Sequence, residues 1–171
     1  PHKTPRRQRQ MCIRDRNLVR TTFKKKREAL RDLLRSQDIQ NAVIFCNRKR
    51  DISTLLSSMK RHGFSATGLH GDMTQSARLA ALDEFKNGQI PLLVASDVAA
   101  RGLDIPSVSH VFNFDVPSNA EDYVHRIGRT GRAGRHGHAF TLIASEDDEK
   151  AILAIEKLTG QPIPFFSNTD W

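Results

Sequence analysis

Four arginines and four glycines, each recurring every third residue, lie between residues 125 and 137 and form the strongest chemical signal in the chain. They are Arg126, Arg129, Arg132 and Arg135, with Gly128, Gly131, Gly134 and Gly137. A guanidinium is a planar cation whose N–H donors suit phosphate oxygens, and glycine lets a backbone approach a ligand closely. Apolar segments flank this Arg/Gly run, so we interpret it as a phosphate-contacting loop held by a folded core.

Three other interpretations of the run are weaker. A collagen-like repeat needs proline and many more triplets than this run contains. A solvated basic loop is the general default for such a composition. A flexible Arg/Gly tail of the RNA-binding kind would not be expected in the middle of a chain, between two apolar segments.

Polar residues also follow three apolar runs, which we expect to be buried strands: 42–46, 64–69 and 91–95. The polar stretches are 47–50, 70–72 and 96–104. In a parallel sheet, ligands bind beyond the carboxyl ends of the strands. We therefore expect these stretches, together with the Arg/Gly loop, to share one rim of the sheet.

Helical periodicity alternates with these runs, and the alternation predicts an α/β fold with a mostly parallel sheet covered by helices on both faces. Further strands are expected at 108–114 and 139–144, and an amphipathic helix at 24–35. Four helix starts are predicted from capping residues, at Asn47, Thr74, Ser118 with Glu121, and Ser145. The inward-facing positions of these helices are expected to include Leu79, Leu82 and Phe85 in one helix and Ile152, Ile155 and Leu158 in another.

Length and composition limit the number of domains and the class of protein. Its 171 residues, 38% hydrophobic and 27% charged, suit one globular domain. Six of the basic residues lie within residues 1–16, where Asp15 is the only acid, so the net charge of +8 is weak support for a polyanionic partner. Segment 1–16 lacks periodicity, and we interpret it as a disordered basic tail foreign to the domain. No apolar run long enough to cross a membrane is visible.

Cysteine usage gives no sign of a disulfide framework or of a metal site. The two cysteines are Cys12 and Cys46, and Cys46 ends an apolar run, so we expect an inert core thiol in a cytoplasmic protein. The acidic cluster at 146–149 is interpreted as carboxylates in the first turn of a helix, where they interact favourably with the helix dipole. No metal is expected in this domain.

Residues 17 to about 160 resemble the C-terminal RecA-like domain of a DEAD-box RNA helicase, because four motifs occur in the order and at the spacing of that family. They are VIFCNRK (43–49), HGDMTQSAR (70–78), ASDVAARGLDIP (95–106) and YVHRIGRTGR (123–132). The stretch NFDVP (113–117) also fits the family. The resemblance implies a RecA-like three-layer sandwich, and residues 161–171 remain as a short C-terminal tail.

On the nucleotide side, the resemblance implies that Arg129 and Arg132 are arginine fingers that reach the γ-phosphate of ATP. Asp104, beside Gly102, matches the carboxylate that binds the ribose hydroxyls. Asp97, Arg101, His125 and Arg126 match positions that couple the motifs. A plain structural role is equally open for these four residues, for example an ion pair between Asp97 and Arg126.

On the RNA side, the resemblance implies that Gly71, Gln75, Arg78 and Ser96 contact the sugar–phosphate backbone, which predicts binding without base specificity. For Arg78 a solvated helix face is the alternative, and for Ser96 a strand-end turn. Asn47 stands where many members have threonine, so helix capping is its expected role.

The chain lacks a Gly-x-x-x-x-Gly-Lys-Ser/Thr loop and an Asp-Glu-Ala-Asp box, so nothing in it can cradle the β- and γ-phosphates or hold Mg²⁺. We therefore expect half of a monomeric enzyme, inactive alone, whose missing N-terminal RecA-like domain holds ATP with Mg²⁺. The alternatives are a non-catalytic RNA-binding or regulatory module and a DNA-acting superfamily 2 helicase.

Overall fold

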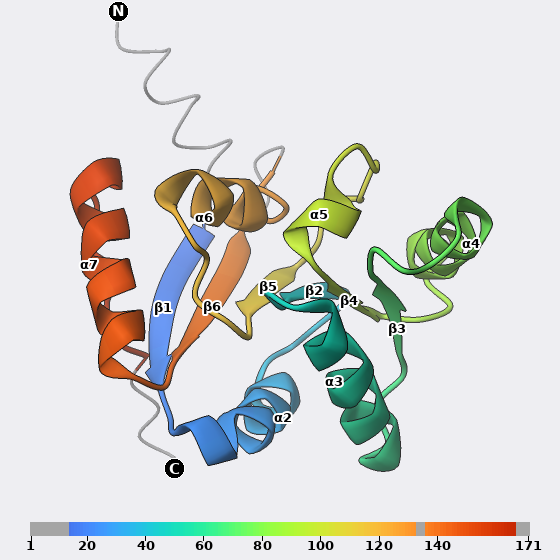
Figure 1. Cartoon of the computed structure of the whole chain (residues 1–171), viewed down its shortest axis with the longest axis horizontal. Coiled ribbons are helices and arrows are strands. Elements are labelled where there is room, and N and C mark those ends of the chain that lie inside the picture. The colour runs from blue at the N-terminus through green and yellow to red at the C-terminus, as the bar shows by residue number, and fades with distance from the viewer. Residues whose placement is uncertain (1–13, 133–135, 167–171) are drawn as a thin grey trace, which may run out of the picture.

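The computed structural model describes residues 14–132 and 136–166, which are built around a six-stranded sheet whose paired strands all run parallel (Figure 1). The strand order is β1-β6-β5-β2-β4-β3. The strands are β1 (Arg14–Arg20), β2 (Ala42–Phe45), β3 (Ala66–Leu69), β4 (Leu92–Ala95), β5 (His110–Asn113) and β6 (Gly137–Ile143). The predicted α/β fold is confirmed, and the short central strands are buried on both faces, as parallel strands usually are.

Helices cover both faces of this sheet and complete the predicted three-layer sandwich (Figure 1). On one face, α2 and α3 pack Leu30, Leu33 and Ile52 against Phe112 of β5. On the other face lie α4, α5, α6 and α7. The bounds are η1 (Phe23–Lys25, a 3₁₀ turn), α2 (Lys26–Ser36), α3 (Lys49–Arg61), α4 (Gln75–Lys86), α5 (Asp97–Ala100), α6 (Ala120–Ile127) and α7 (Glu146–Thr159).

Two of the four predicted helix caps are confirmed. The Thr74 hydroxyl accepts a hydrogen bond from the Ala77 amide at 3.1 Å, and Ser145 caps α7 in the same way. The other two predictions are wrong. The N-cap of α3 is Arg48 rather than Asn47, and α6 is capped by Asn119 rather than Ser118. Asn119 Oδ1 accepts from the Asp122 amide at 2.8 Å, so the capping side chain lies one residue later than expected.

Two predicted core positions are exposed. Leu79 of α4 and Leu158 of α7 have 45% and 76% of their surface accessible, whereas their helices bury Leu82, Phe85, Ile152 and Ile155 as expected. The apolar stripe of each helix is therefore narrower than the sequence suggested. Within the described part of the chain, none of the helices combines the length and apolar character needed to span a bilayer.

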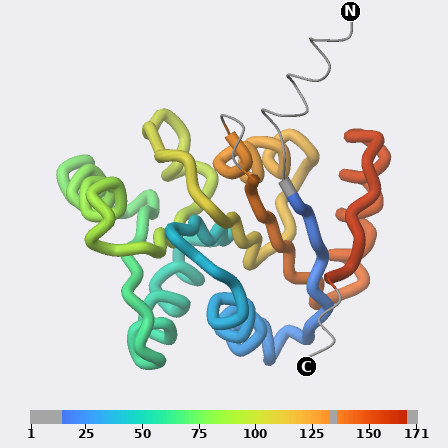
Figure 2. Tube along the Cα trace, turned by 180° about the vertical axis from the view of Figure 1, so that it is seen from behind, coloured from blue at the N-terminus to red at the C-terminus, as the bar shows by residue number. Residues whose placement is uncertain are grey.

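Strand β1 corrects the expectation that residues 1–16 are disordered. Arg14, Asp15 and Arg16 belong to this strand, which pairs with β6 from Arg14 opposite Gly137 to Arg20 opposite Ile143. Seen from behind, β1 runs beside β6 at the edge of the sheet near α7 (Figure 2). Residues 1–13 lie outside the described part of the chain.

Part of the expected C-terminal tail also lies against β1. The Leu18 amide donates to the Pro164 carbonyl at 2.8 Å, and the Phe166 amide donates to the Leu18 carbonyl at 2.7 Å. Ile163, with 5% of its surface exposed, joins the core. Residues 163–166 are therefore packed against the outer side of the edge strand.

Candidate functional site

The centre of the site is a buried arginine, Arg126, at the end of α6. Only 1% of its surface is exposed, and its guanidinium donates to both carboxylate oxygens of Asp97, from Nε at 2.8 Å and from Nη2 at 2.6 Å. It also donates to Asn113 Oδ1 at 3.3 Å and to the Asp115 carbonyl at 2.8 Å. This network joins α6, the start of α5 and the end of β5, and it contains the ion pair between Asp97 and Arg126 that was expected from the sequence as one possibility.

Asn47 belongs to this network, which explains why it is not a helix cap. Its Oδ1 accepts from Arg126 Nη2 at 2.6 Å, and its Nδ2 donates to the Val116 carbonyl at 3.0 Å. Its backbone amide donates to Asp115 Oδ2 at 2.8 Å. The side chain that was expected to open α3 is thus engaged by α6 and by the segment after β5.

Sequence reasoning missed a second buried ion pair beside this network. Lys26 Nζ lies 2.6 Å from Asp115 Oδ1, and the side chains of Lys26 and Asp115 are only 8% and 19% exposed. The lysine also lies 4.5 Å from the centroid of the Phe114 ring. The only signal in the sequence is the presence of Asn113 and Asp115 at the end of the apolar run 108–114, where polar side chains need partners once buried.

The paired arginines follow Arg126 on a loop that the fold holds firmly. Thr130 is fully buried, and its hydroxyl lies 2.6 Å from the Val108 carbonyl. Gly131 has φ +70°, in the left-handed region that favours glycine. A Cβ at Gly137 would lie 2.2 Å from the Gly131 nitrogen, so no side chain fits there. Residues 133–135 of the Arg/Gly run, including Arg135, lie outside the described residues.

Arg129 and Arg132 stand three residues apart on this loop. Within residues 14–132 and 136–166, neither makes an ion pair, although Arg132 Nε donates to the Gly128 carbonyl. Burial lowers the pKa of Arg129, the charge of Arg132 lowers it further, and Asp104 opposes both. The charges of both Arg132 and Asp104 therefore act on the Arg129 guanidinium.

Asp104 presents its carboxylate to solvent. Its side chain is 97% exposed, and its contact with Lys86 is long, at 3.9 Å. Gly102 precedes it with φ +74°, a conformation that side chains rarely adopt, so the turn that presents Asp104 favours glycine. The carboxylate is therefore free to accept hydrogen bonds from a ligand.

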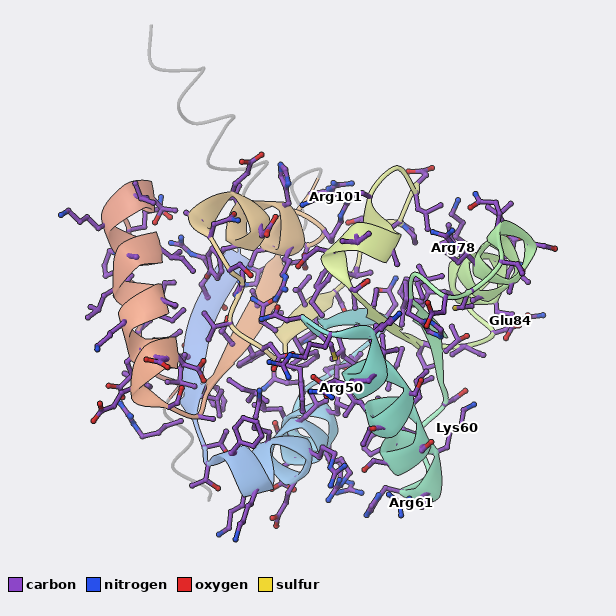
Figure 3. All side chains as sticks on the ribbon, viewed as in Figure 1. Arg50, Lys60, Arg61, Arg78, Glu84 and Arg101 are labelled. Carbon is purple, nitrogen blue, oxygen red and sulfur yellow. The ribbon has the colours of Figure 1, made fainter. Side chains whose placement is uncertain are left out.

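A small pocket collects the residues expected to couple the motifs. Asp97, Arg101, His125, Arg126 and Arg129 all line it, together with Phe45, Ala100 and Asp122. Arg101 Nη2 lies 3.5 Å from Asp122 Oδ1 across the start of α6. Figure 3 shows Arg101 on the same side of the molecule as α5 and α6. Arg61, at the last residue of α3, lies on the opposite side of the molecule.

The residues expected to contact RNA lie along the carboxyl ends of β3 and β4. Gly71 is exposed in the loop after β3, and no atom lies within 4 Å of a Cβ built on it. Gln75 is exposed at the start of α4, and Arg78, on the next turn, has a buried Nε without a protein partner (Figure 3). Ser96 differs from the others because its side chain is buried and accepts from the Ala99 amide at 3.2 Å, capping α5.

The expectation that the Arg/Gly loop shares the carboxyl rim of the sheet is wrong for its backbone. The Val108 amide, which precedes β5, donates to the Arg129 carbonyl at 2.9 Å, and Val108 bridges Thr130. Because α6 runs back from the end of β5 toward the start of β6, the loop lies near the amino ends of these strands. The Arg129 side chain nevertheless reaches the pocket that contains Asp97.

Known proteins resemble this chain in sequence and in fold. The family model of the helicase conserved C-terminal domain matches residues 25–134. The chain belongs to this family. The DEAD-box ATP-dependent RNA helicase CshA of Bacillus subtilis is 51% identical over 137 residues, which are 80% of this chain and 27% of that protein. This helicase domain thus spans about a quarter of the length of the curated relatives that it matches.

Solved structures of DEAD-box proteins share the fold of this helicase domain. Escherichia coli SrmB, bound to the regulator of ribonuclease activity A, has a TM-score of 0.84 and 34% identity, with 91% of this chain and 92% of that chain covered. Saccharomyces cerevisiae Dbp5 bound to RNA and ADP BeF3 has a TM-score of 0.82 and 32% identity, covering 91% and 42%. The predicted resemblance to DEAD-box C-terminal domains is confirmed.

Proposed function

We propose that this helicase domain completes the ATPase site of an RNA helicase by placing Arg129 and Arg132 against ATP held by a second domain. The observation that carries the proposal is the pair itself. Two guanidiniums, three residues apart and without ion pairs among the described residues, stand on a loop fixed by Thr130 and Gly137, and the charge of one acts on the other. Holding two like charges together is unfavourable unless a polyanion neutralises them, and a triphosphate does so.

The residues present fit a nucleotide. When ATP and Mg²⁺ are bound by the partner domain, they supply the phosphoryl group and its charge. Negative charge grows on the phosphoryl oxygens during transfer, and guanidiniums already in place meet it without reorganising solvent. The exposed Asp104 carboxylate would accept hydrogen bonds from the ribose hydroxyls. The Arg126–Asp97 pair fixes α6, so the loop that follows this helix would keep Arg129 and Arg132 directed toward the nucleotide.

The same domain would supply half of an RNA-binding surface. Gln75 and Arg78 lie in the first turns of α4, near the open backbone at Gly71, and an amide and a guanidinium can bind phosphates without reading bases. Affinity should therefore tolerate changes of RNA sequence and fall as salt rises. Ser96 is already used as a helix cap, so we assign most of the contact to α4. Closure of both domains on one strand would bend it and separate a short duplex locally.

A chimera tests the proposal. The chain replaces the matching segment of Bacillus subtilis CshA, unaltered CshA serves as the positive control, and RNA-stimulated ATP hydrolysis and unwinding of a short duplex are measured. We expect the chimera to perform both and the isolated chain to perform neither. A folded chimera that binds RNA without hydrolysing ATP would instead identify a non-catalytic binding module. Preference for DNA in a competition assay would indicate a DNA-acting helicase.

A further inference from the structure

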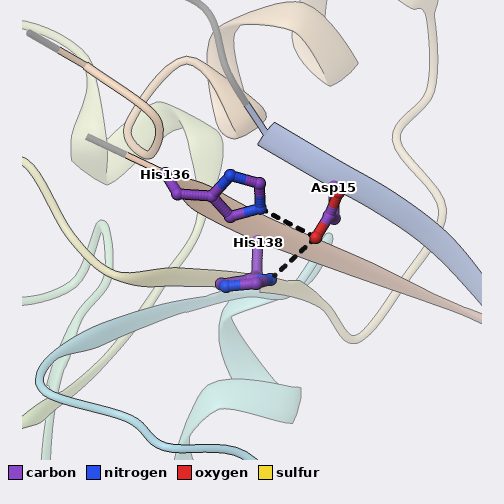
Figure 4. A group of neighbouring side chains, drawn as sticks. All are labelled: Asp15, His136 and His138. Atoms are coloured by element: carbon purple, nitrogen blue, oxygen red, sulfur yellow. Dashed lines mark hydrogen bonds and ion pairs between the residues drawn. The ribbon is translucent and has the colours of Figure 1, made fainter. Parts of the chain in front are cut away.

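A group of metal-ligating side chains lies at the amino end of the sheet, away from the pocket that contains Arg129. Asp15 of β1 faces His136 and His138 across the first residues of β6 (Figure 4). His136 Nε2 lies 2.8 Å from Asp15 Oδ2, and His138 Nδ1 lies 3.5 Å from the same oxygen. The three ligand atoms lie within 4.8 Å of one another. The sequence did not reveal this group because Asp15 and the histidines are far apart along the chain.

We propose that Asp15, His136 and His138 form a binding site for a divalent transition metal such as Zn²⁺. Two imidazoles and one carboxylate are ligands that Zn²⁺ accepts, and sites with three protein ligands leave a fourth position for water. His136 and His138 also line an open, largely polar pocket with Gln40, Asn41 and Ser109, which gives room for that water. The carboxylate already bridges both rings, so a cation would replace a contact that the fold has formed.

Two of the three ligands are held by the backbone and by packing. Asp15 and His138 are directly opposite each other in the β1–β6 ladder. The His138 amide donates to the Ser109 carbonyl at 3.2 Å, and its ring stacks on His110 with centroids 4.8 Å apart. Support of this kind orients metal ligands. His136 lies just before β6 with half of its side chain exposed, so its ring has freedom to close on an ion.

The proposal concerns this chain as it stands, because Asp15 lies in the segment that we interpret as foreign to the domain. A bound metal would join the edge strand β1 to the residues where the Arg/Gly loop returns to the sheet. It should therefore raise the melting temperature of the chain, since a ligand that binds only the folded state stabilises it. This effect does not depend on ATP hydrolysis, so the metal site and the proposed function can fail separately.

Zinc titration of the whole chain tests the site. The chain is prepared without a histidine tag, in a Cys12→Ser background so that this thiol does not compete, and stripped with a chelator. Isothermal titration with Zn²⁺ should give one ion per chain, and Co²⁺ should give the visible absorption of a low-symmetry site. His138→Ala and Asp15→Asn should each lower Zn²⁺ affinity on the order of tenfold or more, because even supporting residues contribute that much.

His62→Ala is the matched control and should leave Zn²⁺ affinity unchanged, since His62 is exposed and directly follows Arg61, which lies across the molecule from β1 (Figure 3). Thermal unfolding without metal checks that every variant folds. The proposal is overturned if the chain takes up no Zn²⁺ at micromolar concentration. It is equally overturned if folded Asp15→Asn and His138→Ala variants bind Zn²⁺ as tightly as the unsubstituted chain.

Discussion

Arg126 donates hydrogen bonds to both carboxylate oxygens of Asp97, and only 1% of the arginine surface is exposed to solvent. A bidentate guanidinium–carboxylate pair is geometrically demanding, and a lysine cannot reproduce it. Because the pair joins α6 to α5, it connects the helix before the paired arginines to the loop that carries Asp104. Stability and site geometry therefore depend on the same contact.

Removing one partner of this pair should destabilise the domain strongly. Asp97→Asn leaves the buried guanidinium without its counter-charge, and a buried ion pair broken in this way typically costs about 3–5 kcal/mol. Urea unfolding monitored by circular dichroism measures the change in the free energy of unfolding. Arg101→Lys is the control, because the Arg101–Asp122 contact is long and the arginine side chain is 68% exposed. An Asp97→Asn variant as stable as this control would show that the pair contributes little.

Ser96 should act mainly through helix capping. Its hydroxyl accepts from the Ala99 amide and its side chain is buried, so Ser96→Ala should lower the free energy of unfolding by about 1 kcal/mol. Ser96→Thr keeps an oxygen in place and should recover most of this loss. Urea unfolding of the two variants gives the comparison. Equal stability of Ser96→Ala and the unsubstituted chain would remove the capping role.

His110 should make stability depend on pH. Burial, helped by the charge of His138, lowers the pKa of His110 from 6.5 to about 4. Between these values the unfolded chain binds a proton that the folded chain does not, so this contribution to stability is present above pH 6.5 and is lost as pH falls toward 4. The loss should not exceed about 3.5 kcal/mol for a shift of this size.

The measurement for His110 is the free energy of unfolding from pH 4 to 7, with and without His110→Phe. The phenyl ring retains stacking on Phe112 and Phe140 but cannot titrate, so the curve of the variant should be flatter in this range. His62→Phe, at an exposed position, provides the control curve. Parallel curves for the His110→Phe variant and the unsubstituted chain would contradict the assignment.

The fold was largely predictable because the alternation of apolar runs with helical stripes leaves few arrangements of a parallel sheet. Thr74 and Ser145 cap as local chemistry predicts. Strand β1 was missed because most of its residues are polar or charged and, among residues 15–20, only Leu18 and Val19 are buried, as an edge position permits. The strand forms by pairing with β6, and no local sequence pattern predicts that pairing.

The ion pair at the centre of the site was one of the expected possibilities, but most of the contacts around it were not predictable. An ion pair between Asp97 and Arg126 was one of the two interpretations of these motif residues and is confirmed, yet its bidentate geometry follows from the packing of α6 against β5 and α5. Asn47 was assigned to capping because local rules favour asparagine at the start of a helix. In the structure its side-chain oxygen instead accepts a hydrogen bond from the Arg126 guanidinium. Likewise, the Asp15–His138 pair exists only through the register of two strands distant in sequence.

The role of the paired arginines is tested most directly in the CshA chimera, by measuring kcat for ATP hydrolysis and RNA affinity in parallel. Arg129→Ala and Arg132→Ala should each lower kcat by on the order of 10³-fold or more, the effect expected of an arginine finger, while RNA affinity stays nearly unchanged. Arg61→Ala, at the opposite end of α3, should alter neither quantity (Figure 3). Equal losses of kcat and RNA affinity, or an unchanged kcat in both variants, would contradict the account.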